Sequence, residues 1–310
     1  MSQPSSRRAV SFLKCPNCGR ELRSGSDDEL RCPGCGREYR TVRAVLRFVD
    51  ESDYAGSFGF QWTRFAKVQL DSASGLPRSR DTFVAKTGWK TSELAGERIL
   101  DAGCGMGRFT EVCCDAGAEV HAVDLSNAVE VAAQNLGERK NAHFYQADIF
   151  RLPFADESFD RVFSIGVLHH TPDTRAAFHR LVRLVRPGGH IAIWVYSTKL
   201  RAMLGSELLR PLTSRLPRGL MLQAAKLAIP LYYVHRFPMV GRISSVLLPT
   251  SLEANPTWRW LDTFDWYTPR YQWKHSDDEV VGWFKEAGLS NIRVGEFPVS
   301  VSGQKPARPA

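Results

Sequence analysis

The sequence predicts an α/β fold whose core is a doubly wound parallel sheet, preceded by a small cysteine-rich module. From residue 97 onward, short runs rich in β-branched and aromatic residues alternate with stretches long enough for helices or long loops. That alternation is typical of βαβ units. In addition, the first run ends in a glycine-rich bend, and two pairs of cysteines lie before residue 40. The predicted strands are the runs RILDAG, EVHAVDL, AHFYQAD, DRVFSIG and HIAIWVY.

Length and composition favour one large hydrophobic core. Of the 310 residues, 43% are hydrophobic, which suffices for a large domain and a small second module. The first stretch, MSQPSSRRAVSFLKC, has too short an apolar run for a secretory signal. The chain also lacks a run of about 18 apolar residues, the length that a membrane-spanning helix needs. We therefore expect a cytoplasmic protein.

Four of the seven cysteines form two CxxC pairs, within CPNCG and CPGCG. This spacing is typical of a tetrahedral four-cysteine zinc ribbon. The competing interpretation is a redox-active pair, although such pairs usually occur singly beside a βαβ unit. We predict a zinc ribbon over residues 1–49 whose Zn²⁺ is structural, because four thiolates leave no open coordination position. The predicted ligands are Cys15, Cys18, Cys32 and Cys35.

Two further parts of the chain follow the ribbon. Residues 50–95 are predicted to form an N-terminal helical connector, and residues 96–310 the main domain. Between about 198 and 265 the alternation of predicted strands with helix-length stretches stops. Apolar residues at helical spacing, interrupted by prolines, predict a helical insertion there. Beyond it, SDDEVVGWFKEAG predicts a helix with Ser276 as N-cap and Glu279 three residues later.

The formal net charge of +8 is concentrated in two segments. Residues 1–50 carry ten Lys and Arg against six Asp and Glu, and residues 198–250 carry eight against Glu207 alone. The rest of the chain is slightly acidic. Such a distribution favours a local anionic partner over a general nucleic-acid surface.

The glycine-rich bend, ILDAGCGMGRFTEV, leads from the first strand into a helix that is predicted to start near Arg108. A bend of this kind places backbone amides and a helix N-terminus over a ligand at the strand ends. The dinucleotide fingerprint G-x-G-x-x-G does not fit, because the glycines are Gly103, Gly105 and Gly107.

The pattern D-x-G-x-G-x-G, opened by Asp101, resembles motif I of the class I S-adenosylmethionine-dependent methyltransferases. LPFADESFDRVFS and RLVRLVRPGGHIAIWVY resemble later motifs of the same family, and the resemblance covers roughly residues 55 to 303. It implies a Rossmann-like seven-stranded sheet and S-adenosyl-L-methionine as methyl donor. FGFQWTRFAKVQLDS and YTPRYQWKHSDDEVVGWFKEAGL resemble a bacterial subgroup that often carries an N-terminal zinc ribbon.

The resemblance also implies roles for individual residues at the cofactor site. Asp101 would support the bend, and its three glycines would approach the methionine end of the cofactor. Asp124 would accept hydrogen bonds from the ribose, and Asp148 would contact the adenine. Gln61 and Trp62 would fold over the cofactor, or else Trp62 packs with neighbouring aromatic residues of the connector.

His169 and His170, in GVLHHTPD just past a predicted strand, are candidates for a catalytic general base. In the alternative interpretation, one histidine caps the turn before Pro172 and the other packs beside the sheet. Further pocket candidates are Trp194, Tyr196, Tyr267 and His275.

The insertion at about 198–265 is expected to cover the methyl acceptor, as additions after the fifth strand do in this family. Its cations and apolar residues suit an anionic membrane surface, a large anionic acceptor, or a helical cap whose charges are merely solvated. We expect a small-molecule, sugar or lipid-like acceptor, with O-methylation favoured.

Two other functions remain open. The first is a methyltransferase of ribosomal or transfer RNA whose ribbon docks the substrate. It is less favoured because the region after Cys35 lacks the interleaved aromatic residues and the basic run of a platform for single-stranded RNA. The second is a non-catalytic scaffold. The complete motif I is evidence against it, because a scaffold does not need an intact cofactor site.

Overall fold

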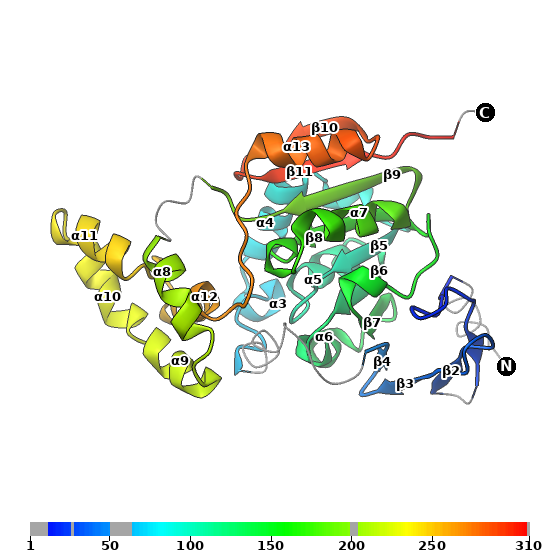
Figure 1. The fold of residues 1–310 in the computed structure, drawn as a ribbon, viewed down its shortest axis with the longest axis horizontal. Helices are drawn as coiled ribbons and strands as arrows, with labels where there is room; N and C mark the ends of the chain where they lie inside the picture. Colours follow the sequence, from blue (N-terminus) through cyan, green and yellow to red (C-terminus); the bar gives the residue numbers. More distant parts are fainter. Residues whose placement is uncertain (1–11, 26–27, 50–63, 199–203, 309–310) are drawn as a thin grey trace.

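The computed structural model describes residues 12–25, 28–49, 64–198 and 204–308 (Figure 1). Its strands form one sheet in the order β1-β2-β3-β4-β7-β6-β5-β8-β9-β11-β10. The strands β5 to β9 run parallel, and β11 enters antiparallel beside β9. The strand bounds are β1 Arg23–Ser24, β2 Glu29–Arg31, β3 Glu38–Val42, β4 Val45–Arg47, β5 Arg98–Ala102, β6 Glu119–Asp124, β7 Ala142–Gln146, β8 Phe159–Ile165, β9 Val185–Trp194, β10 Ser290–Val294 and β11 Ser300–Gln304.

The seven strands from β7 to β10 form the predicted Rossmann-like sheet, so the predicted fold class is confirmed. Helices cover both of its faces. On one face lie α4, α5 and α6, and on the other lie α7 and α13. The helix bounds are α3 Asp71–Ser74, α4 Arg78–Thr87, η1 Thr91–Glu93, α5 Arg108–Asp115, α6 Ala128–Leu136, η2 Ile149–Arg151, η3 Leu168–His170, α7 Thr174–Leu184 and α13 Asp277–Glu286.

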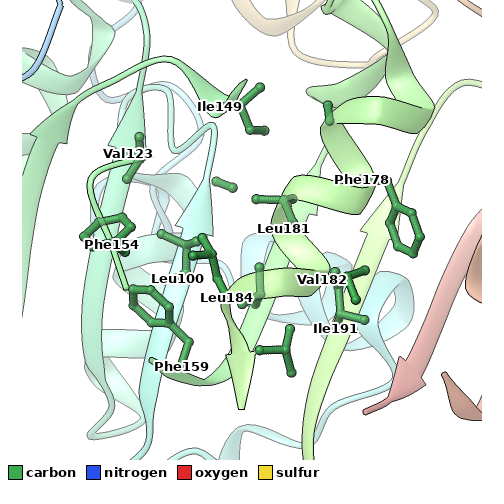
Figure 2. Close-up of a cluster of buried hydrophobic side chains, with 14 of the residues drawn as sticks. Leu100, Val123, Ile149, Phe154, Phe159, Phe178, Leu181, Val182, Leu184 and Ile191 are labelled. Atoms are coloured by element: carbon green, nitrogen blue, oxygen red, sulfur yellow. The ribbon is translucent and has the colours of Figure 1, made fainter. Parts of the chain in front are cut away.

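Alternation along the strands explains why each face has its own core. In β5, Ile99 packs under α5 whereas its neighbour Leu100 points to the opposite face. Figure 2 shows the second core, in which Leu100 and Ile191 belong to one buried cluster with Leu181 and Leu184 of α7. Because both faces are buried, these strands have nearly continuous apolar sequences.

The ribbon is joined to this sheet, which therefore has four strands more than predicted. Its strand β4 runs parallel to β7, with Val45 opposite Phe144. The stretch YRTVRAVLRFV alternates polar and apolar residues as a single strand would, but it forms the two strands β3 and β4. Arg43 and Ala44 both have positive φ, 54° and 63°, and form a two-residue turn between β3 and β4. Such turns favour Asn-Gly, so Arg-Ala gave no turn signal.

The ribbon also contacts the sheet through side chains and an isolated bridge. Leu13 bridges Phe154, and both Arg43 and Arg47 form ion pairs with Glu130 of α6. Glu130 is mostly buried, and these arginines lower the pKa of its carboxyl although burial opposes them. The ribbon is therefore connected to the β7 side of the main sheet through β4, α6 and the segment before β8.

The predicted helical insertion is a group of helices that projects from the sheet beyond β9 (Figure 1). We call the described residues 204–267 the lid. Its helix α12 packs on α8, α9 and α10, and its apolar side chains meet Phe65 of the connector. The helices of the lid are α8 Leu204–Thr213, α9 Arg218–Ala225, α10 Ala228–His235, α11 Val240–Leu247 and α12 Pro256–Tyr267.

The helix after the lid, α13, starts as predicted. The Ser276 side chain accepts a hydrogen bond from the backbone N–H of Glu279 at 3.1 Å, which satisfies one free amide of the first turn. Among the described residues, no helix has both the length and the apolar character needed to cross a bilayer.

Candidate cofactor and acceptor site

The glycine-rich bend lies between β5 and α5 and depends on glycine for its conformation. Gly103, Gly105 and Gly107 have φ values of 96°, 53° and 94°, a region that side chains disfavour. The bend is anchored to β6, because the backbone N–H groups of Gly103 and Cys104 both donate to the carbonyl oxygen of Val123. A Cβ atom at position 103 would lie 2.3 Å from a methyl carbon of Val167, so the chain approaches too closely for any side chain.

Asp124 ends β6 and holds this bend in place. One carboxylate oxygen accepts the N–H of Gly105 at 3.0 Å, and the other accepts the N–H and hydroxyl of Ser126 at 2.8 and 2.7 Å. Burial raises the pKa of Asp124, whereas these donors lower it. The fixed carboxylate lines the cavity described below.

Asp101 supports the bend from inside the protein. It is buried and accepts a hydrogen bond from the Thr110 hydroxyl at 2.7 Å, which ties β5 to the first turn of α5. Burial, with the nearby charge of Asp124, raises the pKa of Asp101 to about 7. Asp101 is not part of the lining of the cavity described below.

A cavity of about 470 Å³ extends from the bend to the lid. Its first end is lined by the bend, Asp124, Ala147 and Ile149, at the carboxyl ends of β5, β6 and β7. Ligands bind at this edge in doubly wound sheets. The Asp148 side chain caps η2 by accepting the N–H of Phe150 at 3.0 Å and is not part of the lining, although both of its neighbours are.

The second end of the cavity is lined by aromatic and charged side chains from the sheet and the lid. Aromatic rings form much of the wall, and cations and carboxylates lie among them. Such mostly apolar walls with a few polar groups are typical of small-molecule sites. The residues are Lys86, Arg108, His170, Thr171, Trp194, Tyr196, Trp258, Leu261, Asp262, Asp265 and Trp266.

Asp262 and Asp265 lie three residues apart on α12 and face the cavity together. The Asp265 carboxyl is buried beside Tyr196, and its Oδ1 has no hydrogen-bond partner among the described residues. Burial and the charge of Asp262 raise the pKa of Asp265 to about 7. Asp262 accepts the Ser251 hydroxyl at 3.1 Å, and burial raises its pKa to about 6. Both carboxyl groups therefore titrate near neutral pH.

Two cations face this acidic pair. The Lys86 ammonium lies 3.2 Å from the centre of the Trp194 ring, and burial together with Arg108 holds the pKa of Lys86 well below its usual value. Arg108 donates to the Ser79 hydroxyl at 3.1 Å and stacks near Trp258. Burial lowers the pKa of Arg108 to about 10.

The two histidines predicted as bases occupy different environments. His169 is fully buried, stacks on Tyr196 with ring centres 3.9 Å apart, and is not part of the cavity lining. His170 lines the cavity, and its Nδ1 lies 2.9 Å from the Tyr271 carbonyl oxygen. A carbonyl only accepts, so Nδ1 carries the proton and Nε2 is the basic nitrogen. Burial lowers the pKa of His170 to about 4, so its ring is neutral at pH 7.

Of the remaining predicted pocket residues, some line the cavity and others lie away from it. Trp194 and Tyr196 line the cavity, whereas Tyr267 donates to the Pro249 carbonyl and His275 contacts Glu279 and Thr174 away from it. Gln61 and Trp62 lie outside the described residues.

Sequence reasoning missed Lys86, Asp262 and Asp265. Lys86 lies in an ordinary polar helix, so nothing in its neighbourhood marks it. The sequence did contain an indication of the two aspartates. They lie three residues apart in the aromatic stretch WRWLDTFDWY and therefore share one face of a helix whose aromatic residues would be expected to be buried.

The four N-terminal cysteines converge in the ribbon. The sulfur atoms of Cys15 and Cys35 are 3.6 Å apart, those of Cys18 and Cys32 are 3.3 Å apart, and all four lie within 4.8 Å of one another. With Zn–S bonds of about 2.3 Å, a tetrahedral site separates its sulfurs by about 3.8 Å. The cluster is therefore compatible with a zinc ribbon.

Residues 100–193 match the family model described as a methyltransferase domain. The chain is 33% identical over 159 residues to the O-methyltransferase rstn1 of Aspergillus nomiae, a match that covers 45% of this chain and 71% of that protein. The chain belongs to the S-adenosylmethionine-dependent methyltransferases.

Other methyltransferases also match part of the chain. The chain is 39% identical over 136 residues to a ubiquinone biosynthesis O-methyltransferase of Alkalilimnicola ehrlichii, covering 41% of this chain and 53% of that one. It thus spans about half the length of that curated relative. Among solved structures, a chain of the complex between the Haloferax volcanii Trm112 methyltransferase activator and a putative methyltransferase is similar, with a TM-score of 0.48 and 14% identity, covering 82% of this chain and 99% of that chain.

Proposed function

We propose that this protein transfers the methyl group of S-adenosyl-L-methionine to a small-molecule or lipid-like acceptor, with a hydroxyl oxygen as the favoured target. The observation that carries the proposal is one continuous cavity, which has the glycine bend and Asp124 at one end and an aromatic wall with buried carboxylates at the other. A methyl transferase needs donor and acceptor sites that meet in one enclosed space, because alignment and exclusion of water supply most of the rate.

At the donor end, the cofactor would supply a methyl group on a sulfonium sulfur, which is an excellent leaving group. We assign its ribose to Asp124, whose carboxylate is already fixed by three donors. The backbone of the bend would approach the methionine part, with Asp101 fixing the bend from below. The adenine would lie against Ala147 and Ile149, beside the predicted Asp148. Gln61 and Trp62 stay assigned to the cofactor as a prediction.

At the acceptor end, a hydroxyl group must lose its proton as it attacks the methyl group. Asp265 suits this role because its Oδ1 lacks a hydrogen-bond partner among the described residues and its carboxylate lines the cavity. His170 is the second candidate, since it also lines the cavity and its neutral ring leaves Nε2 basic. Of the two predicted histidines, the buried stack on Tyr196 disfavours His169 as a base.

We also propose that the four-cysteine cluster holds a structural Zn²⁺. The short sulfur–sulfur separations support this assignment. Four thiolates fill the tetrahedral sphere, so the metal would hold the ribbon together and take no part in methyl transfer.

Calorimetric titration with S-adenosylhomocysteine tests the donor site. The wild-type protein should bind it saturably, and Asp124→Asn should weaken binding at least about tenfold, because charge-assisted hydrogen bonds contribute roughly 1.5–3 kcal/mol. Asp81→Asn is the matched control, because Asp81 is exposed on α4, and its affinity should equal that of the wild type. A folded wild-type protein without saturable binding would overturn the proposal.

A further inference from the structure

The lid exposes an unusual amount of apolar surface. Among the described residues, fourteen of the twenty exposed large hydrophobic side chains lie between 208 and 252. Met239 and Leu208 are 84% and 83% exposed. Soluble monomers rarely expose large contiguous apolar areas, and those that do usually bind something there. The fourteen are Leu208, Leu212, Leu220, Leu227, Tyr233, Val234, Phe237, Met239, Val240, Ile243, Val246, Leu247, Leu248 and Leu252.

These side chains are arranged along the helices that lie farthest from the sheet. On α11, Val240, Ile243 and Leu247 recur at helical spacing and are all exposed, whereas Gly241 packs against α10. Phe237 and Met239 occupy the turn between α10 and α11, at the outer end of the lid (Figure 1). The apolar residues that hold the lid together, such as Leu222 and Phe264, form a separate buried cluster. The exposed set is therefore not needed for the packing of the lid.

Cations accompany the exposed apolar residues. Arg215, Arg218, Lys226, Arg236 and Arg242 are exposed, whereas the lid has a single acid between residues 204 and 250, Glu207. Glu207 itself forms an ion pair with Lys274. A surface that combines exposed leucine, isoleucine and phenylalanine with arginine and lysine is complementary to anionic lipid, in which apolar groups enter the acyl region and cations meet phosphates.

The lid also forms one wall of the candidate acceptor end. Asp262 and Asp265 of α12 face the cavity, and α8, α9 and α10 pack on the same helix. From these contacts we infer that α8–α11 dock on an anionic membrane surface, and that the acceptor is an amphiphile drawn from that membrane. The inference that the lid docks on a membrane depends only on its exposed residues. The inference about the class of acceptor depends also on the proposed function.

Vesicle flotation without any cofactor tests the docking. The full chain should float with vesicles of 70% phosphatidylcholine and 30% phosphatidylglycerol at low salt, and should float much less with pure phosphatidylcholine or at high salt, because salt screens the attraction. Absence of flotation with the anionic vesicles would overturn the inference.

Variants of exposed residues locate the binding surface. Arg215→Gln, Arg218→Gln and Arg242→Gln together should weaken partitioning roughly a hundredfold, since each cation near an anionic surface contributes about fivefold. Arg175→Gln, Arg183→Gln and Arg308→Gln remove the same charge far from the lid and should have a much smaller effect. Equal effects of the two triple variants would contradict docking through the lid.

A second pair of double variants tests the exposed apolar residues. Ile243→Ser combined with Leu247→Ser alters α11, and Leu76→Ser combined with Val294→Ser is the control elsewhere on the surface. Only the α11 pair should reduce flotation. If instead the wild type sediments as a dimer that the α11 pair dissociates, and does not float, the surface is covered by a second copy and the inference is wrong. Both variants should keep the wild-type affinity for S-adenosylhomocysteine, which separates this test from that of the donor site.

The acceptor class is tested with methyl-labelled S-adenosylmethionine and a total lipid extract or an aqueous metabolite extract of the source cells. Label should enter the organic phase with the lipid extract. Label transferred only to aqueous metabolites would overturn the membrane-drawn acceptor, while flotation reports separately on docking.

Discussion

Asp265 and His170 line the same cavity, but their environments push their pKa values in different directions. Burial raises the pKa of the Asp265 carboxyl to about 7 because the charged form is anionic, and lowers that of His170 to about 4 because its charged form is cationic. A base acts only when it is unprotonated. Asp265 therefore becomes active as pH rises through 7, whereas His170 is already unprotonated above about pH 5.

The pH dependence of methyl transfer should distinguish the two groups. If Asp265 takes the proton, the single-turnover rate falls about tenfold for each pH unit below 7, and Asp265→Asn removes this dependence together with most of the rate. His170→Gln should then retain the wild-type profile. A rate that stays level from pH 8 to pH 5 and is lost in His170→Gln would assign the proton transfer to His170. Affinity for S-adenosylhomocysteine, measured in parallel, shows whether each variant retains the donor site.

At the scale of an element, the glycine bend is the part of the fold with the least room for change. In Gly103→Ala, the new methyl group would meet Val167 at 2.3 Å and the residue would keep a φ near 96°. We expect a loss of stability of about 1–3 kcal/mol from the backbone conformation alone, with a further cost from the clash. Chemical denaturation measures it, and weaker S-adenosylhomocysteine binding should accompany it.

A control glycine and a second-site change sharpen this prediction. Gly282, inside α13, has open space where a Cβ would lie, so Gly282→Ala should raise stability by up to about 1 kcal/mol. Adding Val167→Ala to Gly103→Ala should restore part of the loss, because it removes the clash but not the strained φ. If Gly103→Ala is as stable as the wild type, the bend does not require glycine there.

The ribbon is the second element whose behaviour can be tested. β4 pairs with β7, and the Phe48 N–H donates to the carbonyl oxygen of Gln146, just before the loop that carries Asp148. Cys18→Ser should therefore release the metal and loosen β4 and the outer edge of β7 together.

Hydrogen exchange and metal analysis check this expectation. Wild-type protein should contain one zinc per chain, and Cys18→Ser should contain less and exchange faster in β3, β4 and β7. Cys113→Ser is the matched control, since Cys113 is buried in α5 and lies outside the cluster. Faster exchange confined to β1–β3 would show that the ribbon and sheet are independent despite their pairing.

At the scale of the whole molecule, three parts distant in the chain meet around one cavity. The connector contributes Lys86 from α4, the sheet contributes Asp124 and His170, and the lid contributes Asp265. The excess of positive charge lies in residues 1–50 and 198–250, whereas the buried carboxylates of the cavity lie at 262 and 265 on α12. The chain thereby combines a polar reaction site with an outer surface suited to anionic lipid.

The sequence by itself determined the features that depend on local spacing. Short runs rich in β-branched and aromatic residues predicted the strands from β5 to β9, since each must bury both faces, and the glycines at 103, 105 and 107 predicted a bend that requires positive φ. The Ser276 cap and the CxxC pairs were predictable for the same reason, because their partners lie within a few residues or at a known spacing.

Only the tertiary structure decided the acceptor end and the attachment of the ribbon. Asp265 meets Tyr196 across about 70 residues of sequence, and β4 pairs with β7 across nearly 100. The two adjacent histidines could not be separated in sequence, because a single turn of η3 directs His170 to the cavity and His169 into a ring stack. Contacts between distant segments depend on how helices and strands pack together, and residue spacing carries no record of that packing.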